Sequence, residues 1–222
     1  GRVDGVAFRA GVMTNLTQDH LDFHHTMEEY AEAKRLLFTR HRPRAAIFNL
    51  DDDTARRFAK DWGGEGRVTF GLEEANAPDV TARDLELRED GIAMTLVLGP
   101  AGADGRRQAP LRSPLRGLFN ASNILAGAAI GLALGLDAET IASGLAAMPG
   151  APGRFEAVHA GQPFAVYVDY AHTPDAVERI LENARPITRG RVIALLGCGG
   201  DRDPAKRPLM GAALGRLADH AI

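Results

Sequence analysis

The sequence predicts an α/β protein in two parts, and three features of its pattern support this. Apolar runs of strand length alternate with segments of helical periodicity, which is typical of βαβ units around a parallel sheet. The segment 149–155, PGAPGRF, is the best candidate for a linker because Gly and Pro interrupt regular structure. After it the alternation starts again. We therefore expect one part at residues 1–150 and a second at 151–222.

Each element of the first part follows from a local pattern. Residues 45–62 combine an apolar strand, a turn and a helix, with Asp53 or Thr54 as the expected N-cap. Residues 78–115 alternate as short strands around a Gly-rich turn at 99–105. The remaining elements are a strand at 6–16, a helix at 25–41, a strand at 67–72, and helices at 120–136 and 137–148.

The second part repeats the alternation. Thr173 before Pro174 is typical of a helix start, because proline at the first helical position gives up no helical hydrogen bond. A further strand begins near Ile222, and without more strands the Rossmann-like sheet would be incomplete. We therefore expect the sequence to be a piece of a longer protein. The other elements are strands at 164–170 and 191–197 and helices at 174–186 and 209–219.

The composition is that of an ordinary globular protein, with 45% hydrophobic and 25% charged residues. The net charge of −3 gives no electrostatic reason to expect nucleic acid or an anionic membrane as a partner. The single cysteine, Cys198, excludes an internal disulfide and fits a reducing compartment. The apolar run 124–136 is too short to span a bilayer. We expect a cytoplasmic monomer.

The helix at 25–41 carries a lysine in an unusual place. Thr26 and Glu29 form a capping-box pattern, so the helix is expected to begin at Met27. A helical wheel places Lys34 in the middle of an apolar face. The lysine either extends its ammonium to the surface or is a buried, neutral amine that does chemistry or accepts a modification. The apolar face comprises Met27, Tyr30, Ala31, Leu37 and Phe38.

Histidines precede this helix. His20 and His24 are four residues apart, with Asp19 and Asp22 beside them, which raises the possibility of a zinc site. The spacing lies in a turn and lacks the internal glutamate of a zincin motif. A surface loop with histidines near a helix cap is the alternative interpretation.

Two further motifs follow apolar strands. In VDYAHTPDA, 168–176, Asp169 and His172 come just before a helix start, where backbone amides attract a nucleotide or phosphate. The alternative is an ordinary capped helix. In GCGGDRDPAKRP, 197–208, the dinucleotide fingerprint fails because Arg202 stands where glycine is required. Arg202 can instead pair with a carboxylate or phosphate.

Two asparagines three residues apart occupy another helix start. Asn120 and Asn123 lie in LRGLFNASN, 115–123. An amide offers both a donor and an acceptor, so a pair of them can recognise the edge of a nucleotide base. Simple N-capping is the alternative.

Taken in order, these motifs resemble the Mur ligase family, most closely its MurE-type branch. The resemblance covers nearly the whole chain, and YAHTPDA and GCGGDRD are its most specific parts. It implies a portion of a central ATPase domain at 1–150, followed by the first βαβ portion of a Rossmann-like C-terminal domain at 151–222. The motifs are TNLTQDHLDFHHTMEEYAEAK at 14–34, LRGLFNASNILAGAAIGLALG at 115–135, GRFE at 153–156, VDYAHTPDA at 168–176 and GCGGDRDPAKRPLMG at 197–211.

The resemblance implies an ATP-dependent amide ligase of peptidoglycan precursor synthesis, which adds a diamino acid to UDP-N-acetylmuramoyl-L-Ala-D-Glu through an acyl phosphate. It implies that Lys34 is carbamylated by carbon dioxide and, with His20, binds Mg²⁺. Oxygen ligands of a carbamate suit this cation. The implied ATP-binding residues are Asn120, Asn123, Arg154, Asp169 and His172, and the implied substrate-binding residues are Asn15, Thr17, Asp201 and Arg202.

The sequence lacks the GxxGKT-type phosphate loop of the family and the downstream motif that selects the amino acid. We therefore expect this piece to be inactive alone. Three alternatives remain: another Mur-type ligase, such as a cyanophycin synthetase or folylpolyglutamate synthase, a non-catalytic nucleotide-binding module, or a zinc hydrolase built on His20 and His24.

Overall fold

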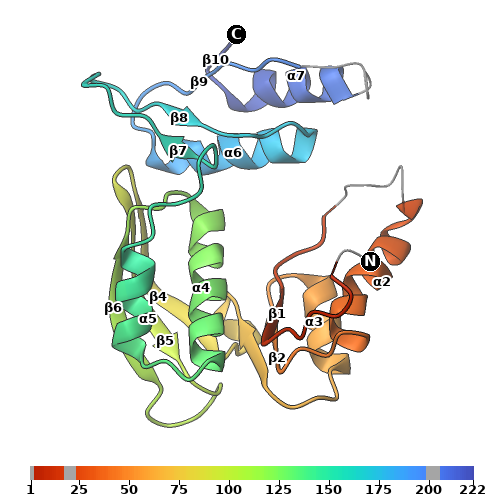
Figure 1. The fold of residues 1–222 in the computed structure, drawn as a ribbon. Coiled ribbons are helices and arrows are strands. Elements are labelled where there is room, and N and C mark those ends of the chain that lie inside the picture. The colour runs from red at the N-terminus through yellow and green to blue at the C-terminus, as the bar shows by residue number, and fades with distance from the viewer. Residues whose placement is uncertain (1–2, 18–23, 199–205) are drawn as a thin grey trace. The chain divides into compact units, whose positions relative to one another are not determined.

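A computed structural model of the chain describes residues 3–17, 24–198 and 206–222 (Figure 1). It confirms the predicted α/β class. Contacts within the chain divide it into two compact units. Unit 1 comprises Gly1–Leu85, Met94–Leu111 and Ala121–Ala147, and unit 2 comprises Glu86–Ala93, Arg112–Asn120 and Met148–Ile222.

The first three strands and the helices between them form two βαβ units of the predicted kind. Strands β1 (Ala10–Met13), β2 (Ala45–Asn49) and β3 (Arg67–Phe70) pair in parallel. Helix α2 (Met27–Thr39) connects the first two strands, and α3 (Asp53–Asp61) connects the second and third. Because the strands are parallel, their carboxyl ends lie at one edge of the sheet.

Three further strands extend this sheet in the order β1-β2-β3-β4-β5-β6. They are β4 (Val80–Arg88), β5 (Gly91–Leu98) and β6 (Arg107–Ser113), the short alternating strands that the sequence predicts. A 3₁₀ turn at Glu74–Asn76 precedes β4, and β3 pairs with β4 in parallel. Helices α4 (Leu118–Ala133) and α5 (Ala138–Ala146) follow.

Unit 1 has a core of small and aromatic side chains. One cluster joins α2, α3 and the first two strands, and Phe48 at its centre is fully buried. Helices α4 and α5 approach closely at glycines: a Cβ on Gly127 would lie 2.9 Å from Leu145, and one on Gly131 would lie 2.7 Å from Ile141. The cluster contains Met13, Ala31, Phe38, Ala46, Phe48, Ala55, Phe58 and Ala59.

Helix starts test the capping predictions. Helix α2 begins at Met27 as expected, and Thr26 Oγ1 accepts a hydrogen bond from the Glu29 amide at 3.1 Å. The Thr26 amide donates to the His24 carbonyl, so only half of the capping box is formed. The prediction that Asp53 or Thr54 caps α3 is wrong by one position, because the cap is Asp52.

Unit 2 contains short strands and two longer helices. Helix α6 begins at Pro174 with Thr173 as its cap, as predicted. Strands β9 and β10 pair in parallel around α7, which gives the expected βαβ unit. The elements are β7 (Glu156–Ala157), β8 (Tyr167–Val168), α6 (Pro174–Ile187), β9 (Ile193–Ala194), α7 (Lys206–Leu217) and β10 (His220–Ala221).

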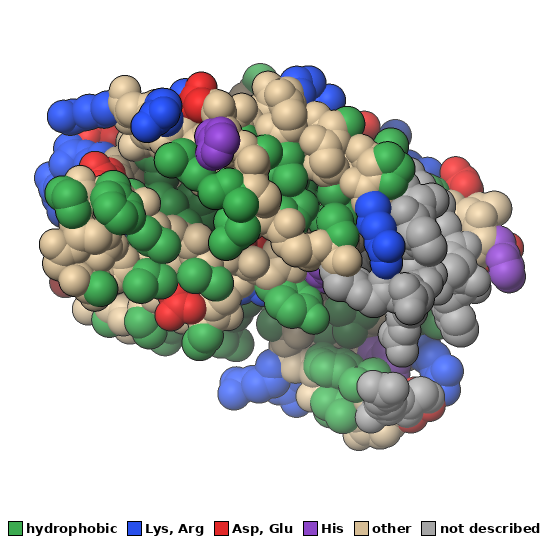
Figure 2. All heavy atoms as spheres, turned by 90° about the horizontal axis from the view of Figure 1, so that it is seen from above, with side chains coloured by type: hydrophobic (Ala, Val, Ile, Leu, Met, Phe, Trp, Pro, Cys, Tyr) green, Lys and Arg blue, Asp and Glu red, His purple; other side chains and the backbone are tan. Residues whose placement is uncertain are grey.

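Strand β8 differs from the prediction. It pairs antiparallel with β7 rather than joining β9 in a parallel sheet. The Val158 amide also donates to the Val166 carbonyl, so residues 156–168 form a local hairpin, and short connections favour antiparallel partners. Apolar side chains remain at the surface of unit 2, where Leu195 is 79% exposed and Tyr170 is 66% exposed. Figure 2 shows hydrophobic side chains (green) on the surface that it views.

The unit 2 core lies between α6, α7 and β9, and its members are Val177, Leu181, Val192, Met210, Ala213 and Leu214. Within the ranges that the structure describes, no helix combines the length and the apolar character needed to cross a bilayer.

Candidate functional site

The segments that follow β1 and β2 meet at the carboxyl edge of the unit 1 sheet. The Asn49 side-chain amide donates to the Thr14 carbonyl at 2.8 Å. The Leu16 amide donates to Asp52 Oδ2 at 3.0 Å, while Asp52 Oδ1 accepts from the Ala55 amide at 2.7 Å. Asp52 therefore caps α3 and also holds the segment after β1, which explains why it is the cap in place of its neighbour.

The predicted substrate residues Asn15 and Thr17 lie on this held segment. Asn15 is exposed and Thr17 is half-buried. Ligands of open α/β sheets bind beyond the carboxyl ends of parallel strands, so both residues occupy the edge where a ligand is expected.

Asp51 extends the same edge to the segment after β3. Its carboxylate accepts hydrogen bonds from the Leu72 amide at 2.6 Å and the Glu73 amide at 3.3 Å, and from the Asn76 side chain at 3.2 Å. A Cβ on Gly71 would lie 2.7 Å from Asp51 Oδ1, so a larger residue there would displace the Asp51 carboxylate. The segments after three parallel strands are thus joined by side chains of Asn49, Asp51 and Asp52.

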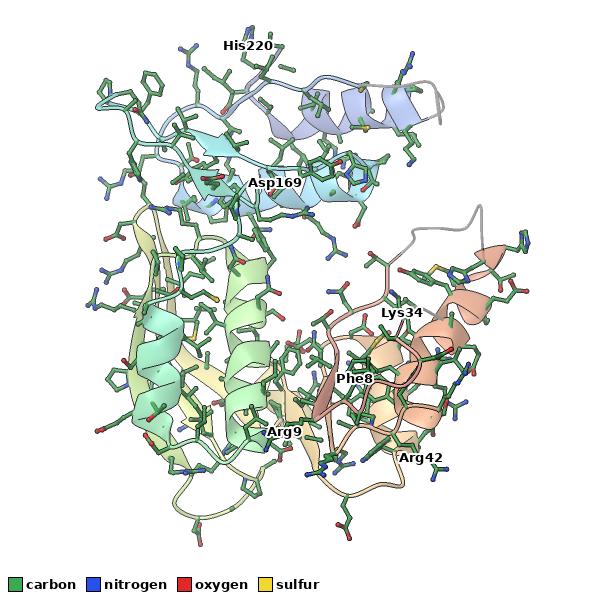
Figure 3. The ribbon with its side chains drawn as sticks, in the orientation of Figure 1. Phe8, Arg9, Lys34, Arg42, Asp169 and His220 are labelled. Carbon is green, nitrogen blue, oxygen red and sulfur yellow. The ribbon has the colours of Figure 1, made fainter. Side chains whose placement is uncertain are left out.

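The helical wheel places Lys34 on the apolar face of α2 and leaves open whether its amine is buried or extends to the surface. Lys34 is exposed, and its ammonium lies 5.0 Å from the centroid of the Tyr30 ring (Figure 3). The His24 ring stacks on the same tyrosine at 4.9 Å. Of the two alternatives left open by the sequence, the ammonium extended to the surface is confirmed and the buried amine is excluded, because the side chain extends over Tyr30, which covers the core beneath it.

Metal ligands can be assessed only in part. His20, Asp19 and Asp22 lie outside the described residues, so the zinc hypothesis there stays a prediction. In the remainder of the chain, no group of three or more His, Cys, Asp or Glu side chains could hold a metal ion. The ammonium form of lysine has no lone pair and no oxygen, so in that form Lys34 offers no ligand of the kind that Mg²⁺ prefers.

The two predicted base-recognition residues lie on α4, which begins two residues earlier than expected. Asn120 is buried and its amide nitrogen donates to the Arg116 carbonyl at 2.8 Å. Asn123 lies one turn further on and is exposed. The alternative that these asparagines cap the helix is wrong, because Asn183 accepts from the first amides of α4.

Asn183 is a long-range cap that the sequence pattern did not reveal. Its Oδ1 accepts from the Leu118 amide at 2.6 Å and the Phe119 amide at 3.4 Å, across 65 residues of sequence. Its nitrogen donates to the Arg179 carbonyl at 2.7 Å. Gly117 has a φ of +82° and its Cβ position lies 3.1 Å from Asn183 Oδ1, so glycine permits this contact. No local signal marks a cap supplied by another helix.

The linker brings three predicted ATP-binding residues close together in unit 2. The Arg154 guanidinium lies 5.3 Å from the centroid of the Tyr170 ring, and that ring contacts His172 with centroids 5.1 Å apart. Asp169 accepts from the Phe155 amide at 2.7 Å and the Ala171 amide at 2.8 Å, so its two oxygens shape the backbone around the motif (Figure 3).

Aromatic packing of Phe155 also fixes the linker. Phe155 is 4% exposed and has a φ of +48°. Its ring stacks on Tyr167 at 4.5 Å and contacts Phe119 edge-on at 5.9 Å. Burial raises the pKa of the Tyr167 hydroxyl, while the charge of Arg116 opposes this shift.

The last two predicted residues, Asp201 and Arg202, lie outside the described residues. Asn15, Thr17, Lys34 and Asn123 belong to unit 1, and Asn120, Arg154, Asp169 and His172 belong to unit 2.

Comparison with known proteins identifies the family. The model of the Mur ligase middle domain matches residues 1–131, more than half of the chain. The chain belongs to the Mur ligase family. A second model, the Mur ligase glutamate ligase domain, matches residues 153–222. The Mur ligase resemblance drawn from the motifs is therefore confirmed.

Relatives in this family match the whole of this chain, but the match covers only part of each relative's own length. A ligase from Streptomyces coelicolor named UDP-N-acetylmuramoyl-L-alanyl-D-glutamate–2,6-diaminopimelate ligase is 46% identical over all of this chain and 43% of its own length. A solved structure with the same enzyme name is 34% identical, with a TM-score of 0.73, and matches all of this chain and 44% of that one. MurF from Acinetobacter baumannii, at 23% identity and a TM-score of 0.78 over 96% of this chain and 46% of its own, shows the shared fold. The chain thus spans less than half the length of these relatives.

Proposed function

We propose that this Mur ligase chain is part of an ATP-dependent amide ligase that adds a diamino acid to UDP-N-acetylmuramoyl-L-Ala-D-Glu. The observation that carries the proposal is the 46% identity, along the whole chain, to a ligase named for 2,6-diaminopimelate. Because the chain spans 43% of that relative, we assign the activity to a longer protein and expect the piece alone to be inactive. We assign residues 1–150 to its central domain and 151–222 to its C-terminal domain.

The proposed reaction has two steps. An oxygen of the terminal carboxylate of the muramoyl dipeptide attacks the γ-phosphorus of ATP, and ADP leaves. The amine of the diamino acid then attacks the acyl carbon, inorganic phosphate leaves, and the amine loses a proton as the amide forms. Since the protein takes no covalent part, its contribution is positioning and stabilisation of charge.

Lys34 and His20 are the proposed magnesium ligands. A carbamate on the Lys34 amine would supply two oxygens, and the exposure of Lys34 supports its access to carbon dioxide. When bound, Mg²⁺ would neutralise phosphate charge. The assignment of His20 rests on the family resemblance alone.

The nucleotide residues are proposed from unit 2 and α4. We assign Asn123, which is exposed, and Asn120 to the adenine. The Arg154 guanidinium, held over Tyr170, is suited to a phosphate oxygen because its donors match oxyanion geometry. We assign Asp169 and His172 to the ribose and phosphates, with Asp169 also shaping the turn that carries His172.

The substrate residues are Asn15 and Thr17 for the muramoyl dipeptide and Asp201 and Arg202 for the diamino acid. The support for the first pair is their place at the carboxyl edge of the sheet. The second pair is proposed from the motif GCGGDRD, in which the Arg202 guanidinium would pair with a carboxylate.

Mass measurement of the longer protein tests the proposal at Lys34. Peptide mapping in bicarbonate without acid is expected to find one carbon dioxide on Lys34, which acidification removes. Lys34→Gln should lower kcat about 10²–10³-fold, the usual cost of losing a group that organises transition-state charge. Because Lys34 is exposed, this change should alter the free energy of unfolding by less than about 0.5 kcal/mol.

Lys60→Gln is the matched control, since Lys60 is also an exposed helical lysine. It should leave both stability and ligation unchanged. Ligation by a protein with an unmodified Lys34 would remove the carbamate from the proposal. A longer protein that consumes no ATP with the muramoyl dipeptide and any diamino acid would overturn the proposed function itself.

A further inference from the structure

We propose that Asn49 and Asp52 are positioning residues for the muramoyl substrate, acting through the backbone on either side of Asn15. This inference rests on the proposed function, which assigns Asn15 and Thr17 to that substrate. Neither Asn49 nor Asp52 belongs to the motifs that carry the family resemblance.

Two hydrogen bonds hold the backbone on both sides of Asn15. Asn49 holds the Thr14 carbonyl at 2.8 Å, and Asp52 holds the Leu16 amide at 3.0 Å. These two groups belong to the peptide planes immediately before and after Asn15. Because the planes define the two backbone dihedrals of a residue, fixing both planes fixes the direction in which the Asn15 side chain leaves the chain.

The two holding side chains are themselves fixed. Asn49 is 7% exposed, and its Oδ1 accepts from the Asp51 amide at 3.0 Å while its nitrogen serves Thr14. Asp52 spends one oxygen on the first turn of α3 and the other on Leu16. The Leu16 side chain also packs against the unit 1 core. An exposed side chain on a segment with three such anchors is pre-organised for binding.

The two anchoring hydrogen bonds join residues that are 35 and 36 positions apart in the sequence, so the formation of a local turn does not require them. An N-cap needs only one acceptor oxygen, which Ser or Thr also supplies. The second oxygen of Asp52 is therefore surplus to capping, and it is the one that reaches the segment with Asn15.

Asp52→Ser separates the two tasks. A serine hydroxyl can still accept from the Ala55 amide, but the shorter side chain offers no second oxygen to Leu16. In the longer protein, kcat/KM for the muramoyl dipeptide should fall about tenfold, the equivalent of one lost hydrogen bond, with KM for ATP within twofold of wild type. The Leu16 amide should also exchange its hydrogen faster.

Asp137→Ser provides the matched control. Asp137 caps α5 through the Thr140 amide at 2.9 Å, and its second oxygen takes only the nearby Thr140 hydroxyl at 2.7 Å. Asp137→Ser makes the same change at a helix cap without loosening a distant segment, so it should leave both KM values unchanged. Equal kinetics for the two serine variants would overturn the positioning role.

Asn49→Asp and Asn15→Ala complete the test. Asn49→Asp keeps the oxygen that accepts from the Asp51 amide but places a second oxygen against the Thr14 carbonyl, where the two acceptors repel. It should therefore lower kcat/KM as Asp52→Ser does. It serves as the test variant if Asp52→Ser fails to fold. In an Asn15→Ala background, either change should have less than twofold effect, because residues that act through one side chain are not additive. Additive losses would contradict the proposal, whereas a wild type that does not ligate would overturn the proposed function instead.

Discussion

The carboxyl edge of the unit 1 sheet and the linker region of unit 2 hold their polar residues by different means. At the sheet edge, parallel strands bring the following segments together, and Asn49, Asp51 and Asp52 tie those segments by hydrogen bonds. Next to the linker the ladder of β7 and β8 is only two residues long, and the buried Phe155 ring and the Asp169 carboxylate hold the linker.

This difference shows how much the positioning of a side chain depends on the regular structure beneath it. The first three strands of unit 1 form four-residue or longer ladders around a buried core. The linker instead depends on a few side chains, so removing one of them should have a larger local effect. Single substitutions can test this contrast.

The largest effect is expected from Phe155→Ala. Phe155 is 4% exposed and contacts two aromatic rings, and truncating such a buried phenylalanine costs about 3–5 kcal/mol. Urea unfolding, followed by a signal from unit 2, measures the loss in free energy of unfolding. Phe164→Ala is the control, since Phe164 is 65% exposed and its removal should cost less than about 0.5 kcal/mol. Similar losses for the two variants would show that the stack does not fix the linker.

A smaller effect is expected from Asn183→Ala. It leaves the Leu118 and Phe119 amides without their acceptor, which should cost about 1–2 kcal/mol in unfolding free energy. Asn183→Asp keeps the acceptor and adds a negative charge near a helix N-terminus, so it should restore most of the loss. An aspartate variant as unstable as the alanine variant would exclude the capping role. Thermal unfolding of both variants beside Glu182→Ala, an exposed neighbour, decides between these results.

The smallest effect is a pH dependence at Asp219. The hydrogen bond from Arg185, with a second from the Val192 amide, lowers the pKa of the Asp219 carboxyl. A carboxyl with a lowered folded pKa stabilises the fold above its unfolded pKa of about 3.9, and this contribution disappears as the pH falls through the folded pKa. Asp219→Asn should therefore be less stable than wild type at pH 6, and the two proteins should be equally stable at a pH below the folded pKa of Asp219. Melting temperatures across this range measure it, and a difference that does not change with pH would be inconsistent with the ion pair.

Local signals in the sequence were sufficient for much of the fold. The Thr26 cap, the Thr173–Pro174 helix start and the alternation of strands and helices are all set by neighbouring residues, and all are confirmed. The cap of α3 was misplaced by one residue because three consecutive aspartates can each cap, and the choice of Asp52 depends on Leu16, far away in sequence.

Tertiary contacts decided what local patterns could not. A helical wheel gives the direction of Lys34 but not the reach of its side chain, so the sequence left open whether the ammonium is buried or lies at the surface over Tyr30. The pairing of β8 depended on the hairpin at 156–168, and the cap of α4 depended on a side chain from α6. The predicted ligand roles of the site residues stay predictions.

The cap of α4 also links this helix to the order of protein synthesis. A chain is made from its N-terminus, and Asn183 follows the first amides of α4 by 65 residues. While the ribosome adds these residues, the start of α4 must use water as its acceptor. The first turn of α4, which carries Asn120, therefore gains its capping hydrogen bonds only after α6 has emerged. A completed first turn in α4 thus indicates that the chain has been synthesised at least as far as Asn183.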